Sequence, residues 1–206
     1  HGPATLFLHT GAMNLIRPSM GSWVSYGLGT ENDNLPAYIT LHPPASKGGP
    51  RNYSNSFLPA LYQGTAIGRA GVPVGEASIR HIQNTTLTKE QQRKQFKYLQ
   101  ALNRKQVGSS GDDQLEATVE SFELAWRMQM HAPEVLDLSR ETKETQSLYG
   151  IDQPATKDYG RMCLLARRMC EAGVRFVQVN YADNAPTPRW DQHSNLKQHE
   201  KHALAT

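Results

Sequence analysis

Apolar side chains recur every three or four residues in the middle of the chain, which is the spacing of one face of an α-helix. The clearest run consists of Leu115, Val119, Phe122, Trp126 and Met130. A shorter run upstream of it consists of Phe96, Leu99 and Leu102. The two runs predict two consecutive amphipathic helices, each with one face turned toward other parts of the protein.

The ends of these two helices are marked in the sequence. Thr88 and Gln91 have the spacing of a capping box, in which each side chain hydrogen-bonds to the backbone N–H of the other residue. Gly108 and Gly111 then interrupt the helical pattern. We therefore predict an antiparallel helical hairpin, inside a helical insert that spans residues 88–150.

A helix followed directly by a strand is predicted near residue 173. The helix has an apolar stripe formed by Met162, Leu165 and Met169. Gly173 supplies a residue that tolerates the left-handed backbone conformation at a helix end. Residues 174–181 are rich in β-branched and aromatic side chains on both faces, which is typical of a central strand covered on both sides. A helix and such a strand in succession indicate an α/β fold.

The first 75 residues are rich in Gly, Pro, Asn and Ser and are predicted to be mostly loops. A short helix is expected at 20–26, a buried strand at 37–41 and at most one short strand within 64–75. The strand at 37–41 must end before Pro43, because proline cannot donate a hydrogen bond to a neighbouring strand. Together the patterns predict one incomplete α/β domain over 1–206, with a partial doubly wound, mostly parallel sheet and the helical insert.

Composition and charge narrow the classes of function. The chain has 206 residues, of which 38% are hydrophobic, and a mean hydropathy of -0.60. No stretch approaches the roughly 20 apolar residues that a membrane-spanning helix needs. The formal net charge is +3, and there is no dense basic run with interleaved aromatic residues. We therefore expect neither a membrane span nor a nucleic-acid partner.

Two pairs of residues on the predicted helix before Gly173 are given structural roles. Cys163 and Cys170 are seven residues apart, about 10 Å along a helix, which is too far for a disulfide. Both are predicted to be small core residues. Arg167 and Arg168 are predicted to lie on the solvent side of the same helix.

Residues that could bind a metal lie in the loop after the strand predicted at 174–181. In open α/β sheets, ligands bind beyond the carboxyl ends of the strands. Asp191 and His193 lie in the next loop and are two residues apart, so their side chains point the same way if the loop is extended. A carboxylate and an imidazole that face one point are a common part of a zinc or manganese site. The alternative is a turn with a capping aspartate.

The other histidines give weaker signals. His199 and His202 lie on one face of a predicted C-terminal helix, where they could share a metal or simply face water. His1 and His9 lie in the glycine-rich start, where a hydrogen-bonding role in a loop is the alternative. The sequence has no nucleophile elbow, no Walker phosphate loop and no Rossmann fingerprint, so no catalytic nucleophile is identified.

Several longer motifs resemble a bacterial sulfatase-like family of unknown function, family 1501 among the domains of unknown function, which is placed in the alkaline phosphatase superfamily. The motifs that carry the resemblance are residues 1–4, 9–11, 17–29, 34–36, 57–64, 163–168, 173–179 and 190–195. They extend over nearly the whole chain, and the most specific is Trp-Asp-Gln-His-Ser-Asn at 190–195.

The resemblance implies a fold and an activity. Proteins of this superfamily hold one or two divalent metals over the strand ends, where the metals polarise a phosphate or sulfate ester and activate a nucleophile. It implies a metal-dependent hydrolase of small-molecule or polysaccharide esters, with Asp191 and His193 as ligands of zinc, manganese or calcium. His1, His9 and His199 are possible further site members. Members of the family are generally exported, so an exported protein is expected.

Some of the family's motifs are missing. They are an acidic upstream strand and downstream segments resembling Gly-Glu-Phe-Gly-Arg and Gly-Arg-Asp-His-Asn. We therefore expect the chain to be a piece of a longer protein that lacks both ends and is inactive alone. Two alternatives are a non-catalytic binding or scaffold protein on the same fold, and an assembly role for the helices within 88–150.

Overall fold

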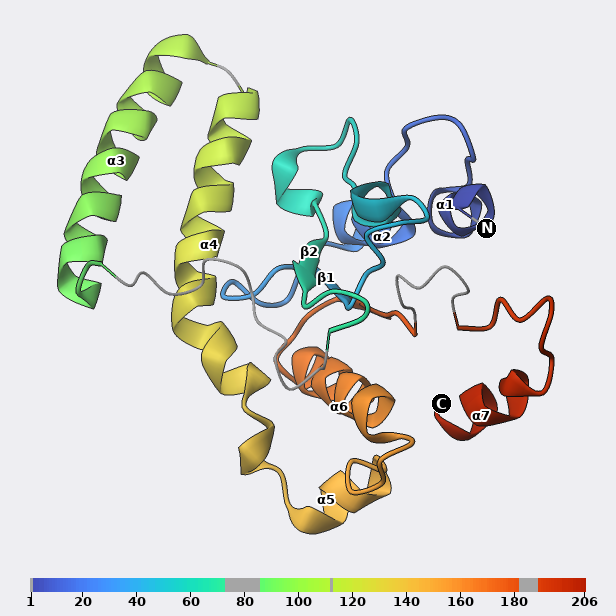
Figure 1. Ribbon diagram of the computed structural model, residues 1–206. Coiled ribbons are helices and arrows are strands. Elements are labelled where there is room, and N and C mark those ends of the chain that lie inside the picture. The colour runs from blue at the N-terminus through green and yellow to red at the C-terminus, as the bar shows by residue number, and fades with distance from the viewer. Residues whose placement is uncertain (1, 73–85, 112, 182–188) are drawn as a thin grey trace.

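A computed structural model describes residues 2–72, 86–111, 113–181 and 189–206 (Figure 1). Its centre is a sheet of three parallel strands, β1 (Tyr38–Leu41), β2 (Thr65–Ile67) and β3 (Phe176–Val179), in the order β2-β1-β3. Ile39 is aligned with Thr65 on one side and with Val177 on the other. The predicted α/β class and parallel sheet are confirmed.

Helices and short 3-10 turns surround this sheet. In chain order they are α1 (Gly2–Thr10), α2 (Met20–Leu28), η1 (Gly49–Tyr53), η2 (Ala60–Tyr62), α3 (Lys89–Ser110), α4 (Asp113–Leu136), η4 (Leu138–Arg140), α5 (Lys143–Leu148), α6 (Lys157–Glu171) and α7 (Gln198–Leu204). Among the described helices, none combines the length and the apolar character that crossing a lipid bilayer requires.

The hydrophobic core lies between one face of the sheet, α6 and α4. Side chains alternate between the two faces of a strand, so Ile39 and Leu41 point to the same side, where Ile67 joins them in the core. The predicted stripe of α6 covers this face with Met162, Leu165 and Met169, all nearly inaccessible to solvent.

The opposite face of the sheet is more polar and is covered by α2. Tyr38 donates a hydrogen bond to Gln178 (2.9 Å), Gln178 donates to Asn180 (2.9 Å), and Asn180 donates to Thr40 (2.9 Å). This chain of hydrogen bonds satisfies buried polar groups that would otherwise destabilise the fold. Helix α2 approaches closely because Gly21 has no side chain: a Cβ there would lie 2.6 Å from the ring of Tyr38.

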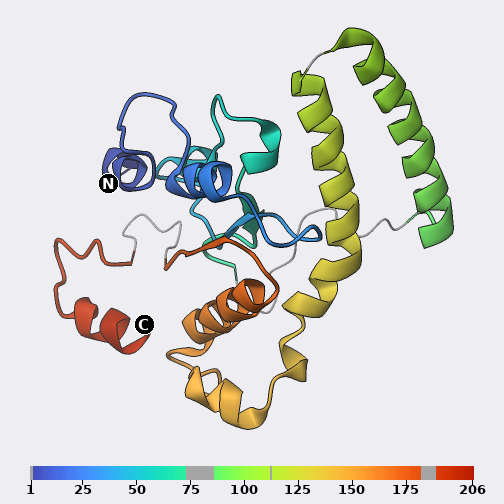
Figure 2. The same ribbon diagram turned by 180° about the vertical axis from the view of Figure 1, so that it is seen from behind.

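The helical hairpin is present as predicted, and α3 lies on the side of α4 away from the sheet (Figures 1 and 2). The capping box is formed at the start of α3: Oγ1 of Thr88 accepts from the backbone N–H of Gln91, and Oε1 of Gln91 accepts from that of Thr88. Gly111 ends the helix in the left-handed conformation.

Several predictions from the sequence are corrected. The strand at 174–181 was expected to be central, but β1 holds the centre and β3 lies at one end of the sheet in the described part of the chain. Helix α1 was not predicted, because its segment is rich in small and loop-forming residues. Cys170 is exposed, whereas Cys163 is half-buried.

Arg167 and Arg168 were expected on the solvent side of α6, and this prediction is wrong. Both guanidinium groups bind the Glu141 carboxylate, at 2.6 Å from Arg167 and 2.5 Å from Arg168. Arg168 also donates to the backbone carbonyls of Glu134 (2.9 Å) and Val135 (2.8 Å). These bonds attach α6 to the last turn of α4 and to the chain that follows it.

Candidate functional site

The loop that carries the predicted metal ligands includes the described residues Arg189 to His193. Oδ1 of Asp191 lies 2.5 Å from Nε2 of His193, so the two side chains meet. The Asp191 side chain is 16% exposed and that of His193 is 79% exposed. The carboxylate is thus held against the protein while the imidazole faces solvent, which leaves the pair accessible from one side.

A left-handed backbone turn at Trp190 (φ 69°) immediately precedes this pair. That conformation is unfavourable for a bulky residue and needs support from its surroundings. The indole ring packs against three other rings, with centroid distances of 5.8 Å to His199, 5.9 Å to His202 and 6.3 Å to Tyr181. These contacts attach the Asp191 loop to α7 and to the residue that follows β3.

His202 fixes the other side of this aromatic cluster. One ring nitrogen lies 3.5 Å from the hydroxyl of Tyr181, and the other lies 3.2 Å from the amide of Gln192. His199, a predicted site member, packs against Trp190 with the two rings tilted by 49°, and its Nε2 is buried with no hydrogen-bond partner in the described structure. The predicted helix face with two histidines is therefore largely used for packing.

Asp191 and His193 have the right chemistry to bind a divalent metal, but two protein ligands are too few for a complete site. A carboxylate oxygen and a neutral imidazole nitrogen are both ligands of zinc and manganese. A catalytic zinc site needs at least three protein ligands. Among the described residues, no three His, Cys, Asp or Glu side chains come together. A third ligand would have to come from outside that part of the chain, so the role of the pair as metal ligands stays a prediction.

Two further histidines near the N-terminus were predicted as possible site members. His1 lies outside the described residues. His9 lies on α1, half-buried, where burial lowers the pKa of its imidazole and a hydrogen bond with Asn52 opposes this effect. The hydrogen bond with Asn52 joins α1 to η1, and a role of His9 at the site stays a prediction.

His42 was not predicted as a candidate, yet it directly follows the carboxyl end of the central strand β1. Only 4% of its surface is exposed, its backbone is left-handed (φ 50°), and its Nε2 has no hydrogen-bond partner. Burial lowers the pKa of the imidazole, against a hydrogen bond with the backbone of Arg69. Gly68 makes room for the ring, since a Cβ there would lie 2.6 Å from Nε2. The position of His42 after a buried strand was the signal that could have indicated it.

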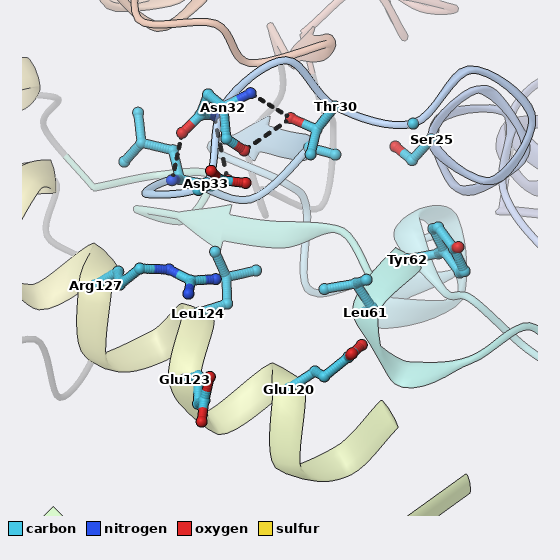
Figure 3. Close-up of a pocket in the computed structure, with 13 residues that line it drawn as sticks. Ser25, Thr30, Asn32, Asp33, Leu61, Tyr62, Glu120, Glu123, Leu124 and Arg127 are labelled. Atoms are coloured by element: carbon cyan, nitrogen blue, oxygen red, sulfur yellow. Dashed lines mark hydrogen bonds between the residues drawn. The ribbon is translucent and has the colours of Figure 1, made fainter. Parts of the chain in front are cut away.

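A separate cavity of about 340 Å³ lies near the opposite, amino-terminal ends of the strands, between α4, η2 and the loop that follows α2 (Figure 3). Its apolar lining includes Leu61 and Leu124, and its charged lining includes Asp33, Glu120 and Arg127. Nε of Arg127 is buried with no hydrogen-bond partner. Glu123 also lines the cavity and forms an ion pair with Arg104. No ion pair joins Asp33, Glu120 and Arg127 to one another in the described structure, so the cavity presents charges of both signs.

Comparison with known proteins gives a family but no relative of known activity. The chain matches none of the curated proteins and none of the solved structures with which it was compared. A family model, described as protein of unknown function (DUF1501), matches residues 1–206. The match covers the full length of the sequence, and the chain therefore belongs to this family of proteins of unknown function.

Proposed function

We propose that the chain forms part of a metal-dependent hydrolase of sulfate or phosphate esters. The observation that carries the proposal is the 2.5 Å contact between the Asp191 carboxylate and the His193 imidazole. A mostly buried carboxylate and an exposed imidazole meet there, in the loop that follows a strand of a parallel sheet. Catalytic groups of α/β enzymes are found in this place.

In this proposal Asp191 and His193 would hold a divalent ion, zinc, manganese or calcium. When bound, the ion would polarise the ester and lower the pKa of a bound water. Trp190 would position the carboxylate, because its packed ring fixes the turn from which Asp191 extends. The remaining ligands and the nucleophile would come from outside the described residues. Placement in the alkaline phosphatase superfamily and export from a bacterial cell belong to the same proposal.

Metal binding tests this proposal more directly than turnover does. We expect isothermal titration of the 206-residue chain with Zn²⁺ or Mn²⁺ to show one site. Asp191→Asn and His193→Gln should each weaken binding by about tenfold or more, as loss of a ligand does. His131→Gln is the control, since His131 is an exposed histidine on α4.

Two results would contradict the proposal. One is equal binding by the wild-type chain and the Asp191→Asn variant. The other is binding that His131→Gln weakens as much as His193→Gln does, which would indicate surface histidines in general. Because the ligand set is incomplete, hydrolysis of an aryl sulfate or aryl phosphate by this chain alone is expected to be absent.

Binding without catalysis is a second candidate function, and the cavity at the amino-terminal ends of the strands favours it. Its volume falls in the range of small-molecule sites. A ligand with one charge would leave Arg127 or the carboxylates of Asp33 and Glu120 unpaired. A zwitterion with an apolar body, such as a free amino acid, would pair both signs and cover Leu61 and Leu124.

Three related probes distinguish this binding role. We expect leucine to bind more tightly in calorimetry than leucinamide, which lacks the carboxylate, or 4-methylpentanoate, which lacks the amine. Arg127→Gln should abolish the preference of leucine over leucinamide, because the guanidinium would no longer pair with the carboxylate. Equal affinity for all three compounds, or no detectable binding of any of them, would show that the cavity is not a site for zwitterions.

A further inference from the structure

Two large apolar side chains of the helical hairpin are half exposed to solvent. Leu99 of α3 is 49% exposed and Phe122 of α4 is 50% exposed. Both belong to the apolar stripes from which the helices were predicted. Neighbouring apolar side chains left open on one face commonly mark an interaction surface.

These side chains line an open groove of about 560 Å³ between α3 and α4. The apolar lining residues are Phe96, Leu99, Phe122, Ala125 and Trp126. The others are all glutamine or asparagine, so no charged side chain lines the groove. An uncharged face of apolar and amide side chains can pack against an identical face without like-charge repulsion.

The interface between α3 and α4 contains few apolar contacts. Gln92 donates to the side chain of Gln129 (2.8 Å), and Gln100 donates to the carbonyl of Val119 (3.2 Å). The aromatic contact in this interface is the stack of Phe96 on Trp126, at 5.2 Å between centroids. Gln100 is the one buried side chain among those described in α3. Most of the apolar surface of α3 is therefore available to a partner.

We propose that this groove is a dimer interface, occupied by α3 and α4 of a second copy of the chain. Packing the two hairpins face to face, about a twofold axis parallel to the helices, forms an antiparallel four-helix bundle. The 22 residues of α3 give a face about 33 Å long and about 20 Å wide, or roughly 650 Å² per copy. That area lies at the lower end of what stable interfaces bury.

The charges of the hairpin favour a second copy over other occupants. Helix α3 carries six lysines and arginines and one glutamate, whereas α4 from residue 115 onward carries four glutamates and one arginine. The twofold axis places the basic helix of each copy opposite the acidic helix of the other. These charges lie outside the groove, so they set the orientation of the dimer while the apolar groove holds it together.

Sedimentation equilibrium of the 206-residue chain over a range of concentrations tests the proposal. We expect a monomer–dimer equilibrium that Leu99→Glu weakens by about tenfold or more, because a charge would enter the desolvated groove. The matched control is Ala101→Glu, which adds the same charge two residues further along α3 at an exposed position outside the groove. It should leave the equilibrium unchanged. Circular dichroism checks that both variants keep the helix content of the wild-type chain.

Three outcomes would overturn the inference. They are a monomer at all concentrations up to about 100 times the expected micromolar dissociation constant, a dimer that Leu99→Glu does not weaken, and a dimer that both variants weaken equally. Binding of a monomeric chain to phosphatidylglycerol vesicles, lost in Leu99→Glu, would assign the groove to a membrane surface instead. Metal binding at Asp191 is independent of all these results.

Discussion

The buried imidazole of His42 makes stability depend on pH. Burial lowers the pKa of His42 and, on α1, of His9. Each group therefore binds its proton more readily when the chain is unfolded. Its contribution to stability is complete above the unfolded pKa of about 6.5 and is lost as the pH falls from there toward the folded pKa.

We accordingly expect the free energy of unfolding to decrease between about pH 7 and pH 5. His42→Asn, which tolerates the left-handed backbone, should make this decrease shallower because one of the two groups is gone. Urea denaturation at several pH values measures the effect. If the free energy of unfolding depends on pH in the same way in the wild-type chain and the variant, protonation of His42 is not coupled to folding.

The close packing of α2 on the sheet depends on a single missing side chain. Gly21→Ala would place a Cβ 2.6 Å from the ring of Tyr38, and overpacking of this kind costs about 1–3 kcal/mol. Gly27 is the matched control on the same helix, because a Cβ there has no neighbour within 4 Å. Gly27→Ala should stabilise the protein by about 0.5–1 kcal/mol. Thermal denaturation should move the two midpoints in opposite directions.

At the scale of elements, one carboxylate joins α6 to the chain that follows α4. Hydrogen bonds from Arg168 and then from Arg167 lower the pKa of Glu141. A carboxyl group with a lowered pKa stabilises the fold above its unfolded pKa of about 4.3 and loses this effect as the pH falls through the folded pKa. The bridge between these elements is thus intact at neutral pH and is lost in acid.

Removing this carboxylate tests its role. Glu141→Gln should lower the melting temperature at pH 7, because two guanidinium groups lose their shared partner. The difference from the wild-type chain should shrink as the pH falls below about 4.3, because the unfolded chain then binds a proton that the folded carboxylate, with its lowered pKa, resists. Glu171→Gln is the control, since Glu171 is 63% exposed and forms a more distant ion pair with Arg167, at 3.3 Å. Equal losses in both variants would contradict a special role for Glu141.

At the scale of the whole molecule, stability is unevenly distributed. The sheet and α6 share one buried core, whereas α3 buries one described side chain and lies away from that core. Segments with few buried apolar contacts open at lower free energy than the core does. The hairpin is therefore the part of the molecule that a partner would stabilise most.

Hydrogen exchange measures this difference. In dilute solution the backbone amides of α3 should exchange at least about tenfold faster than those of α6, although both helices are fully hydrogen-bonded. Raising the protein concentration should slow exchange in α3 and α4 and leave α6 unchanged, since dimerisation would cover only the hairpin. Equal protection of α3 and α6 in dilute solution would show that the hairpin belongs to the same cooperative unit as the core.

Local patterns in the sequence determined much of this structure. The capping box at Thr88, the glycine at 111, the stripe of α6 and the buried strand β1 were all predicted, because each depends on residues within a few positions of one another. The meeting of Asp191 and His193 was predicted for the same reason, since residues two apart in an extended loop face one way.

Features that depend on contacts between distant segments could be learned only from the tertiary structure. It placed β1 rather than β3 at the centre of the sheet, bound Arg167 and Arg168 to Glu141, and buried His42 beside Gly68. It also left Leu99 and Phe122 open. Periodicity shows that a face is apolar, but what covers that face depends on contacts between segments that are far apart in the sequence.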